Sequence, residues 1–290
     1  MTRGTGRARR PYTALVLAAS RGGSDPLAAA QHPSHKCLVR VGGEPMLLRV
    51  LRTLGASESI GRIASSIADP EVLAAVPGLA HLLDWRSIAM VPSAATPSLS
   101  VARAVETLEN PWPLLVTTAD HPLLTPVMVD HFCAEAVSAE ADLAVALAAA
   151  SLVLARHPDT RRTFLRVRGE RYTGCNMFAL MTPNAARAAD FWQTLEAHRK
   201  RPWRILKAFG AAASLRFLAG GMTLEAAMGA ASRRLDLKAV AVEMPFPDAA
   251  IDVDKPDDLA LAEAVLRARE AAGDAPAMYS RPSWPHTKNQ

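Results

Sequence analysis

The first residues of chemical interest lie in a loop that follows an apolar, strand-like run near the start of the chain. The stretch ALVLAASRGG, residues 14–23, ends in small residues, and a lysine follows at position 36. Backbone N–H groups at the carboxyl end of a sheet strand can bind a phosphate, with Gly22 and Gly23 allowing close approach and Arg21 and Lys36 offsetting its charge. An ordinary turn would have the same composition. The loop matches neither GxxxxGK[ST] nor GxGxxG, which argues against a P-loop NTPase and a dinucleotide-binding oxidoreductase.

A second segment places an aspartate at the end of another apolar run. In LLVTTADHPLLTP, residues 114–126, the strand-like residues stop at Asp120, and a helix is expected from about Pro126. An aspartate at the tip of a central strand is well placed to hold Mg²⁺ against the phosphates of a ligand. A carboxylate that solvates a turn or caps the helix would look the same in the sequence.

A third segment carries two alternating aspartates before the last helix. In AAIDVDKPDDLALAEAVL, residues 249–266, Asp252 and Asp254 alternate with apolar residues. In an extended chain their carboxylates lie on the same side, about 7 Å apart. Asp254 occupies the expected N-cap position ahead of Pro256, so we interpret Asp252 as the freer ligand and Asp254 as the cap. A purely structural role for the pair stays open.

The segments around these residues alternate between strand and helix patterns, which is typical of βαβ units with helices on both faces of a sheet. Strands are predicted at 12–18, 87–91 and 113–118, followed by helices at 44–54, 98–108 and 126–138. Further strands are predicted at 142–149, 163–168, 174–180, 237–244 and 249–253, a mostly helical region at 183–231, and a final helix at 256–272. The sequence therefore predicts an α/β fold, a three-layer α/β/α sandwich with a mixed, mainly parallel sheet and a helical insertion.

The predicted domain organisation has one folded unit. Residues 1–11 are expected to be a basic, flexible N-terminus, residues 12–272 the domain with its helical insertion at about 183–231, and residues 273–290 a flexible tail. No apolar stretch is long enough to cross a bilayer, and no secretory signal is recognisable, so a cytoplasmic location is expected. The three cysteines are widely spaced and are expected to be reduced.

The charge distribution argues against a general nucleic-acid-binding face. The net charge is +5, and two basic clusters at 3–10 and 199–207 together exceed that surplus, so the remainder is near neutral. The second cluster is interleaved with Trp203, Phe209 and Phe217, an amphipathic pattern that suits a membrane surface or a lipid-like acceptor through 199–217. A helical cap that packs its apolar residues inward and leaves Arg and Lys in solvent is the favoured interpretation, and its basic residues could reach an acidic acceptor.

Taken together and in this order, the three segments resemble the MobA-like NTP-transferase family. Its first motif, LAAGxGxRM…KPLxxVxGxP, is similar to LAASRGG…KCLVRVGGEP here, its mid-chain Asp-x-Pro to ADHPLLTP, and its DxDTPEDL to DVDKPDDL. PSLSVARAV, residues 97–105, is similar to the serine-containing helix start that faces the nucleobase. The resemblance covers about residues 12–270 and implies a GT-A-like, Rossmann-like nucleotidyltransferase fold. Wider relatives include molybdenum-cofactor guanylyltransferase and the cytidylyltransferases of sugar and polyol phosphates.

The resemblance also implies roles for individual residues. The implied catalytic residues are Lys36, Arg21 and Asp120, and the implied metal ligands are Asp120 and Asp252 for Mg²⁺. Nucleotide-binding positions would be Leu17, Ala18, Ala19, Ser20, Arg21, Gly22, Gly23, Lys36, Ser98 and Ser100. Acceptor-binding positions would be His121, Tyr172, Gly174 and Asn176, although His121 would more commonly be satisfied by a neighbouring carboxylate and Gly174 could simply bend its strand. Ser20 replaces the usual glycine, the second arginine of the motif has no clear counterpart, and the run from Ser20 to Lys36 is long.

The function implied is transfer of an NMP from an NTP, with GTP and CTP as leading candidates, to a phosphorylated small-molecule acceptor. An acceptor phosphate oxygen would attack the α-phosphorus in line and pyrophosphate would leave. One alternative is a GT-A-type glycosyltransferase that uses a nucleotide-sugar, and it is disfavoured because the usual DxD at the strand end is replaced by TAD. The other is a catalytically degenerate nucleotide-binding regulatory protein, favoured by the departures in the first loop. The sequence does not indicate the oligomeric state.

Overall fold

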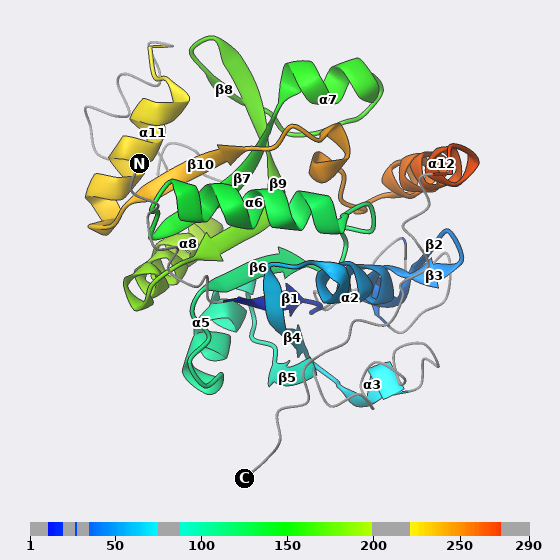
Figure 1. Ribbon diagram of the computed structural model, residues 1–290, viewed down its shortest axis with the longest axis horizontal. Helices are drawn as coiled ribbons and strands as arrows, with labels where there is room; N and C mark the ends of the chain where they lie inside the picture. The colour runs from blue at the N-terminus through cyan, green and yellow to red at the C-terminus, as the bar shows by residue number, and fades with distance from the viewer. Residues whose placement is uncertain (1–10, 20–26, 28–34, 75–87, 199–220, 274–290) are drawn as a thin grey trace, which may run out of the picture.

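The fold was analysed in a computed structural model, which describes residues 11–19, 27, 35–74, 88–198 and 221–273. Its centre is an eight-stranded sheet with the order β10-β7-β9-β6-β1-β4-β5, to which β8 is added along β9 (Figure 1). The strands are β1 (Tyr12–Leu17), β4 (Ile60–Ile67), β5 (Ile88–Pro92), β6 (Leu114–Thr118), β7 (Leu143–Ala149), β8 (Leu165–Val167), β9 (Glu170–Leu180) and β10 (Ala239–Glu243). Strand β9 runs antiparallel to its neighbours β6, β7 and β8, and the other pairs are parallel, so the predicted mixed, mainly parallel sheet is confirmed.

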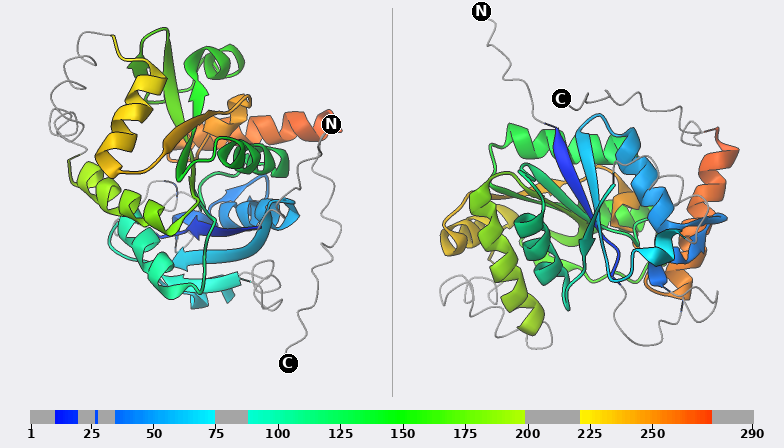
Figure 2. Two further views of the ribbon diagram at one scale, coloured as in Figure 1. Left: turned by 60° about the vertical axis from the view of Figure 1, so that its left-hand side comes forward. Right: turned by 90° about the horizontal axis from the view of Figure 1, so that it is seen from below.

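Helices cover both faces of the sheet, which makes three layers (Figure 2). Side chains of α2 (Met46–Ala56) and α6 (Pro126–Ser138) share one hydrophobic core with one sheet face. Side chains of α5 (Pro97–Thr107), α8 (Arg187–His198) and α11 (Leu224–Leu235) share a second core with the opposite face. Shorter elements are α3 (Glu71–Ala74), α7 (Ala150–Arg156), η2 (Pro183–Ala186) and η3 (Pro247–Ala250), and α12 (Pro256–Ala271) ends the described chain.

Two helices begin directly beyond the carboxyl ends of strands because the same short motif caps both. Thr96 and Thr125 each precede a proline at the first helical position, and their side chains accept hydrogen bonds from the backbone N–H groups of Leu99 and Met128. Threonine at the N-cap followed by proline is a strong helix-start signal. The predicted starts of these two helices, near residues 98 and 126, therefore agree with the structure.

Three assignments differ from the sequence prediction. Strand β4, with Gly61 and two serines, was not identified, because its Ser65 and Ser66 look polar although both are fully buried in the middle of the sheet. Helix α7 lies directly after β7 and was also missed. The predicted strand 249–253 is wrong: its start belongs to the 3-10 helix η3, and the rest does not pair with a strand. Its Ile251 and Val253 are buried against α12 in a third core, and the Val253 N–H donates to the Asp120 carbonyl at 2.8 Å.

The predicted helical region 183–231 is described in part. The described portions contain η2, α8 and α11, and residues 199–220 lie outside the described residues, as do residues 1–10 and 274–290. The prediction of an amphipathic surface at 199–217 therefore stays a prediction. None of the described helices is both long and apolar enough to cross a membrane.

The partly buried carboxylate of Asp248, in η3, connects this element to the end of α7 and to α12. The Asp248 carboxylate contacts His157 Nε2 at 2.7 Å and accepts a hydrogen bond from Arg269 Nη2 at 2.7 Å, and Arg269 Nη1 also donates to the Leu123 carbonyl. Burial would raise the pKa of Asp248, but the hydrogen bonds from His157 and Arg269 outweigh it, and the pKa lies below its ordinary value. The charged carboxylate therefore stabilises the fold.

We expect Asp248→Asn to lower the free energy of unfolding near neutral pH by about 2 kcal/mol, because Arg269 loses its charged partner. A carboxyl group with a lowered folded pKa stabilises the protein above its ordinary pKa of about 3.9. That contribution disappears as the pH falls through the lower folded pKa. Urea denaturation at neutral and at acidic pH should therefore show a wild-type advantage that shrinks below about pH 4. The exposed Asp159→Asn variant serves as control, and a pH-independent difference would contradict the assignment.

Candidate functional site

The site lies where three parallel strands end together. Leu17, the last residue of β1, pairs with Ser66 of β4 on one side and with Thr118 of β6 on the other. Beyond it the backbone continues the sheet briefly, since the Ala18 N–H donates to Ser66 O at 2.9 Å and the Ala119 N–H to Leu17 O at 3.0 Å. Asp120 follows immediately. The carboxyl ends of parallel strands are where ligands bind in open α/β sheets, and the first two predicted segments meet there.

Lys36 reaches this edge from a short 3-10 helix, η1 (Lys36–Leu38), which precedes the hairpin β2 (Arg40–Val41) and β3 (Glu44–Pro45). The hairpin turn is Gly42 and Gly43, with φ of 58° and 81°, a left-handed conformation that favours glycine. A Cβ at Gly42 would lie 2.8 Å from the guanidinium of Arg49, whose Nε donates to the Val41 carbonyl. The GGEP motif therefore begins with a tight hairpin turn, in the segment that follows Lys36.

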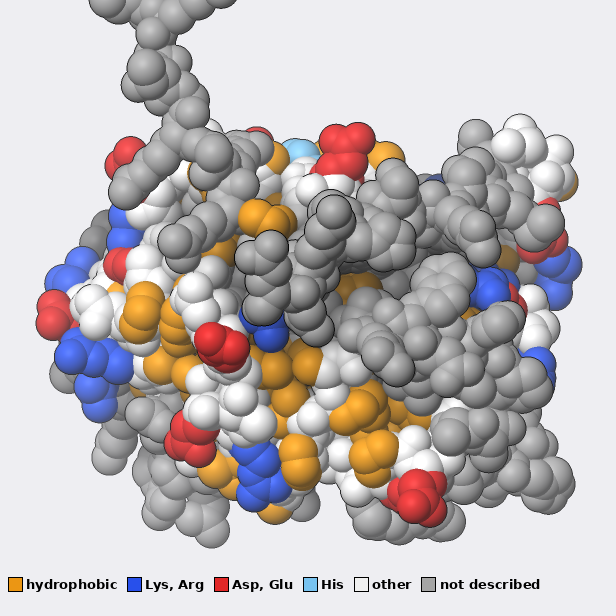
Figure 3. All heavy atoms as spheres, turned by 60° about the horizontal axis from the view of Figure 1, so that its bottom comes forward, with side chains coloured by type: hydrophobic (Ala, Val, Ile, Leu, Met, Phe, Trp, Pro, Cys, Tyr) orange, Lys and Arg blue, Asp and Glu red, His pale blue; other side chains and the backbone are white. Residues whose placement is uncertain are grey.

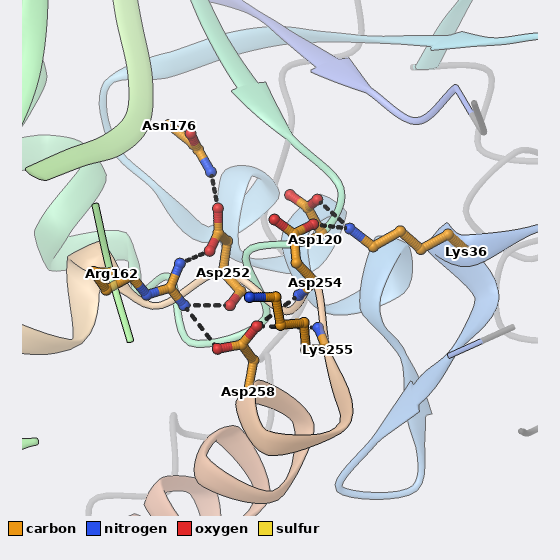
Figure 4. A network of polar contacts seen from close by, with 8 residues as sticks. All are labelled: Lys36, Asp120, Arg162, Asn176, Asp252, Asp254, Lys255 and Asp258. Atoms are coloured by element: carbon orange, nitrogen blue, oxygen red, sulfur yellow. Dashed lines mark hydrogen bonds and ion pairs between the residues drawn. The ribbon is translucent and has the colours of Figure 1, made fainter. Parts of the chain in front are cut away.

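The Lys36 ammonium bridges two carboxylates that are far apart in the sequence. Its Nζ lies 2.8 Å from Asp120 Oδ2 and also forms an ion pair with Asp254 Oδ1 (Figure 4). Burial would lower the pKa of Lys36, but the two carboxylates outweigh it and raise the pKa above its ordinary value. Burial likewise would raise the pKa of Asp120, but Lys36 and the nearby Thr118 hydroxyl outweigh it and lower that pKa. Both groups are therefore charged around neutral pH.

Asp252 and Asp254 have the opposite roles to those expected. The Asp254 side chain is 59 % exposed and meets Lys36, whereas the Asp252 side chain is 19 % exposed and forms an ion pair with Arg162 Nη1. Asn176 Nδ2 donates to Asp252 Oδ2 at 2.7 Å. The helix cap is not Asp254 either: α12 has Lys255 at its N-cap position, and Asp258 accepts hydrogen bonds from the N–H groups of Asp254 and Lys255. The interpretation of Asp252 as the freer carboxylate is wrong, because the sequence does not reveal its arginine and asparagine partners.

Asn176 owes its position to an irregularity in β9. In the pairing with β7, Val145 lies opposite Phe178 and Leu147 opposite Gly174, so the chain of β9 carries extra residues between these pairs. Asn176 has φ of 50°, in the left-handed region that asparagine tolerates better than most residues. The bulge turns the Asn176 amide toward Asp252.

Two substitutions separate the backbone role of Asn176 from its side-chain role. Both Asn176→Ala and Asn176→Gly remove the hydrogen bond to Asp252, but glycine adopts the left-handed conformation without a steric cost. We expect the alanine variant to be less stable than the glycine variant by about 1 kcal/mol in chemical denaturation. Equal stabilities would show that the backbone at this position relaxes.

Of the four predicted acceptor residues, one lies in the interior and three lie on one face of β9. His121 is only 1 % exposed, and burial lowers its pKa to about 4 despite the charge of Asp120, so its ring is neutral and lies inside the protein. Tyr172, Gly174 and Asn176 share one face of β9, and Tyr172 Oη donates to Glu243 Oε1 at 3.1 Å. A Cβ on Gly174 would meet nothing within 4 Å, so this face is open there.

The described nucleotide-binding candidates lie near the ends of β1 and α5. Leu17 and Ala18 are buried and Ala19 is exposed. Ser98 and Ser100 are buried at the start of α5, where Ser98 Oγ lies 3.0 Å from Thr96 Oγ1 and Ser100 Oγ accepts from the Ala94 N–H. In this structure the two serines therefore support their own helix start. Ser20, Arg21, Gly22 and Gly23 lie outside the described residues.

Arg162, Asp254 and Asp258 are site residues that the sequence analysis did not assign. Arg162 lies in HPDTRRTF, between α7 and β8, where no motif distinguishes it from the neighbouring Arg161. The alternation in DVDKPDD did identify the correct segment. Only the partners of each carboxylate could show which residue points to Lys36.

The site suits a magnesium ion that completes its shell with substrate. Asp120 and Asp254 converge on one cation, the Lys36 ammonium, and Asp120 Oδ1 is buried with no well-formed hydrogen bond to the described residues. Within the described ranges, no group of three or more His, Cys, Asp or Glu side chains could hold a metal ion. Mg²⁺ is commonly held by one or two carboxylates together with substrate phosphates and water, so two carboxylates fit this ion.

On the face shown in Figure 3, the described Lys and Arg side chains stand in small groups, with Asp and Glu near them and hydrophobic side chains between them. The three cysteines are buried and form no disulfide, and burial raises the pKa of Cys37 and of Cys175 to about 12, so these two thiols stay protonated.

Solved structures share this fold. A hypothetical transferase from Thermus thermophilus is 28% identical, with a TM-score of 0.70 over 86% of this chain and 100% of that chain. CMP:2-keto-3-deoxy-manno-octonic acid synthetase in complex with CTP superposes with a TM-score of 0.55 at 15% identity, covering 89% and 99%. 4-Diphosphocytidyl-2C-methyl-D-erythritol synthase from Anaerococcus prevotii gives 0.51 at 14% identity, covering 89% and 99%. The last two likenesses show the fold alone.

The sequence itself decides the family. No curated protein sequence matches the chain. Residues 14–219, which include the loop before Lys36 and the Asp120 strand end, match the MobA-like NTP transferase domain. The sheet order, the strand-end site and this match agree, and the chain is a nucleotidyltransferase that belongs to the MobA-like NTP transferase domain family.

Proposed function

We propose that the protein transfers an NMP from an NTP to a phosphorylated small-molecule acceptor, with Mg²⁺ as cofactor and release of pyrophosphate. The observation that carries this proposal is the position of the Lys36 ammonium between Asp120 and Asp254 at the carboxyl ends of β1 and β6. A cationic side chain beside two carboxylates provides the two kinds of group that phosphate transfer needs. The ammonium group would bind phosphoryl oxygens, and the two carboxylates would hold a divalent cation.

The reaction needs positioning and charge stabilisation rather than a covalent nucleophile. An oxygen of the acceptor phosphate forms a bond to the α-phosphorus, and the bond from that phosphorus to the oxygen bridging to the β-phosphate breaks, so that pyrophosphate leaves. In the reactive complex Lys36 would turn from Asp254 to an α-phosphate oxygen and stabilise its charge. Mg²⁺ held by Asp120 and Asp254 would neutralise the phosphate oxygens. Asp252, the second metal ligand implied by the resemblance, is left out because Arg162 and Asn176 hold it.

The substrates would approach from two directions. The NTP would lie over Leu17, Ala18 and Ala19, with the following loop, and Arg21 in it, around its phosphates and the start of α5 near its base. The acceptor would lie on the open face of β9, at Tyr172, Gly174 and Asn176. His121 is buried, so this proposal gives it no direct contact with the acceptor.

The identity of the nucleotide rests on analogy. GTP and CTP are the leading candidates, and a solved structure with the same fold contains CTP. Since NTPs and phosphorylated metabolites are cytoplasmic substrates, we propose a cytoplasmic location.

A product-based screen tests the proposal. The four NTPs with Mg²⁺ would be combined with phosphorylated sugars, polyols and cofactor precursors, and pyrophosphate would be measured. A nucleotidyltransferase releases pyrophosphate only with the correct acceptor. Release of a nucleoside diphosphate from a nucleotide-sugar would instead indicate a glycosyltransferase. Tight nucleotide binding without turnover across the screen would favour a regulatory protein.

A further inference from the structure

Arg162 is placed to act on the site without touching a substrate. It lies in the segment between α7 and β8, and its side chain is 11 % exposed. Its Nη1 forms an ion pair with the Asp252 carboxylate, and its Nη2 donates to the Asp252 backbone carbonyl. Nη2 also lies 3.6 Å from Asp258 Oδ1. One guanidinium therefore holds a side chain and a backbone group of the same aspartate and reaches the first turn of α12 (Figure 4).

Asp258, which Arg162 contacts, also holds the backbone of Asp254, the residue that forms the ion pair with Lys36. Its Oδ2 accepts hydrogen bonds from the N–H of Asp254 at 3.1 Å and from the N–H of Lys255 at 3.0 Å. Val253, between the two aspartates, is fully buried and donates its N–H to the Asp120 carbonyl. The backbone on both sides of Asp254 is thus fixed relative to Asp120.

The two aspartates would otherwise be interchangeable. Side chains two positions apart in an extended segment lie on the same side of the chain, about 7 Å apart, which is close enough for either to reach a cation beside Asp120. In the structure only Asp254 reaches Lys36. Asp252 is turned away, with one oxygen toward Arg162 and the other toward Asn176.

We propose that Arg162 is a positioning residue that withholds Asp252 from the cation site and leaves Asp254 as the partner of Asp120. This inference rests on the proposed function, because it assumes that Asp120 and Asp254 hold the metal. On this inference, Arg162 alone determines which of the two aspartates, Asp252 or Asp254, faces the cation site.

The test is a comparison of Mn²⁺ affinities of the full-length protein without nucleotide, measured by electron paramagnetic resonance. With Arg162 present, Asp254→Asn is expected to weaken Mn²⁺ binding by about 10-fold or more, and Asp252→Asn by less than about 3-fold. In the Arg162→Met background the released Asp252 becomes a ligand. There, a further Asp252→Asn substitution should weaken binding by about 5-fold or more.

A matched control separates positioning from general charge. Asp257→Asn in the Arg162→Met background removes the same charge from an exposed position in the first turn of α12 and should change the affinity by less than about 3-fold. The Arg269→Met variant, which removes a comparably buried arginine bound to Asp248, should bind Mn²⁺ as the wild type does. If Asp252→Asn has the same effect with and without Arg162, or if Asp257→Asn weakens Mn²⁺ binding as much as Asp252→Asn does in the Arg162→Met background, the inference is wrong.

Failure of the proposed metal site looks different. If Asp120→Asn and Asp254→Asn both bind Mn²⁺ as tightly as the wild type, the protein has no cation site there, and the proposed function loses its basis. Should Arg162→Met not fold, Arg162→Lys replaces it, since lysine keeps the charge but cannot contact Asp252 and Asp258 in the same forked geometry. An Asp252→Asn effect in that background as small as in the wild type would also overturn the inference.

Discussion

Asp120→Asn is expected to lower the rate of pyrophosphate release by about 10²–10³-fold at saturating substrates, because it removes a charge that both Lys36 and the metal ion require. Asp254→Asn should have an effect of the same order, since its carboxylate converges on the same ammonium. Asp252→Asn should have a smaller effect, because that carboxylate is already bound to Arg162 and Asn176. The measurement is steady-state pyrophosphate release with varied Mg²⁺, which also reports the apparent metal affinity.

The control for this series lies at the opposite edge of the sheet. Asp130 on α6 accepts hydrogen bonds from Ser57 Oγ at 2.6 Å and from the Ser59 N–H at 2.9 Å, just before β4 begins. Asp130→Asn should alter stability rather than turnover, because its carboxylate holds the turn before β4, at the end of that strand opposite to Lys36 and Asp120. Turnover by Asp120→Asn within about 5-fold of the wild type would contradict the proposed metal role of Asp120.

Lys36→Met is expected to change two measured quantities in opposite directions. Turnover should fall by about 10²-fold or more, because the α-phosphate loses its positively charged partner in the transition state. Mn²⁺ binding to the nucleotide-free protein should become tighter by about 5-fold or more, because the ammonium no longer lies between the two carboxylates. These two results together would identify Lys36 as a catalytic group and, before the nucleotide binds, as a competitor of the metal.

Misfolding of the variant would not produce this combination of lower turnover and tighter Mn²⁺ binding. A general loss of structure would weaken turnover and metal binding together. Lys238→Met, which removes an exposed lysine near the amino end of β7, should leave both quantities as in the wild type. Unchanged or weaker Mn²⁺ binding by the folded Lys36→Met variant would show that the observed ion pairs do not compete with a metal ion.

Several parts of the fold follow from local sequence. The apolar runs of β1 and β6, the Thr-Pro starts of α5 and α6, and the order of the three polar segments are all readable without coordinates. Local propensity and hydrophobic spacing determine such elements. Strand β4 was missed because Ser65 and Ser66 interrupt its apolar pattern. Their burial depends on the strands β1 and β5 beside β4 and on the helices that cover both sheet faces.

The sequence by itself determined the family, and it singled out Lys36, Asp120 and the 252–254 segment as candidate site residues because the three motifs occur in the family's order. Only the tertiary structure decided which aspartate faces Lys36. Arg162, about 90 residues earlier in the chain, binds Asp252, and the left-handed Asn176 in a bulge of β9 directs its amide to the same carboxylate. Partners so distant in sequence leave no local pattern, because their contacts depend on how the strands and the turn before α12 pack together.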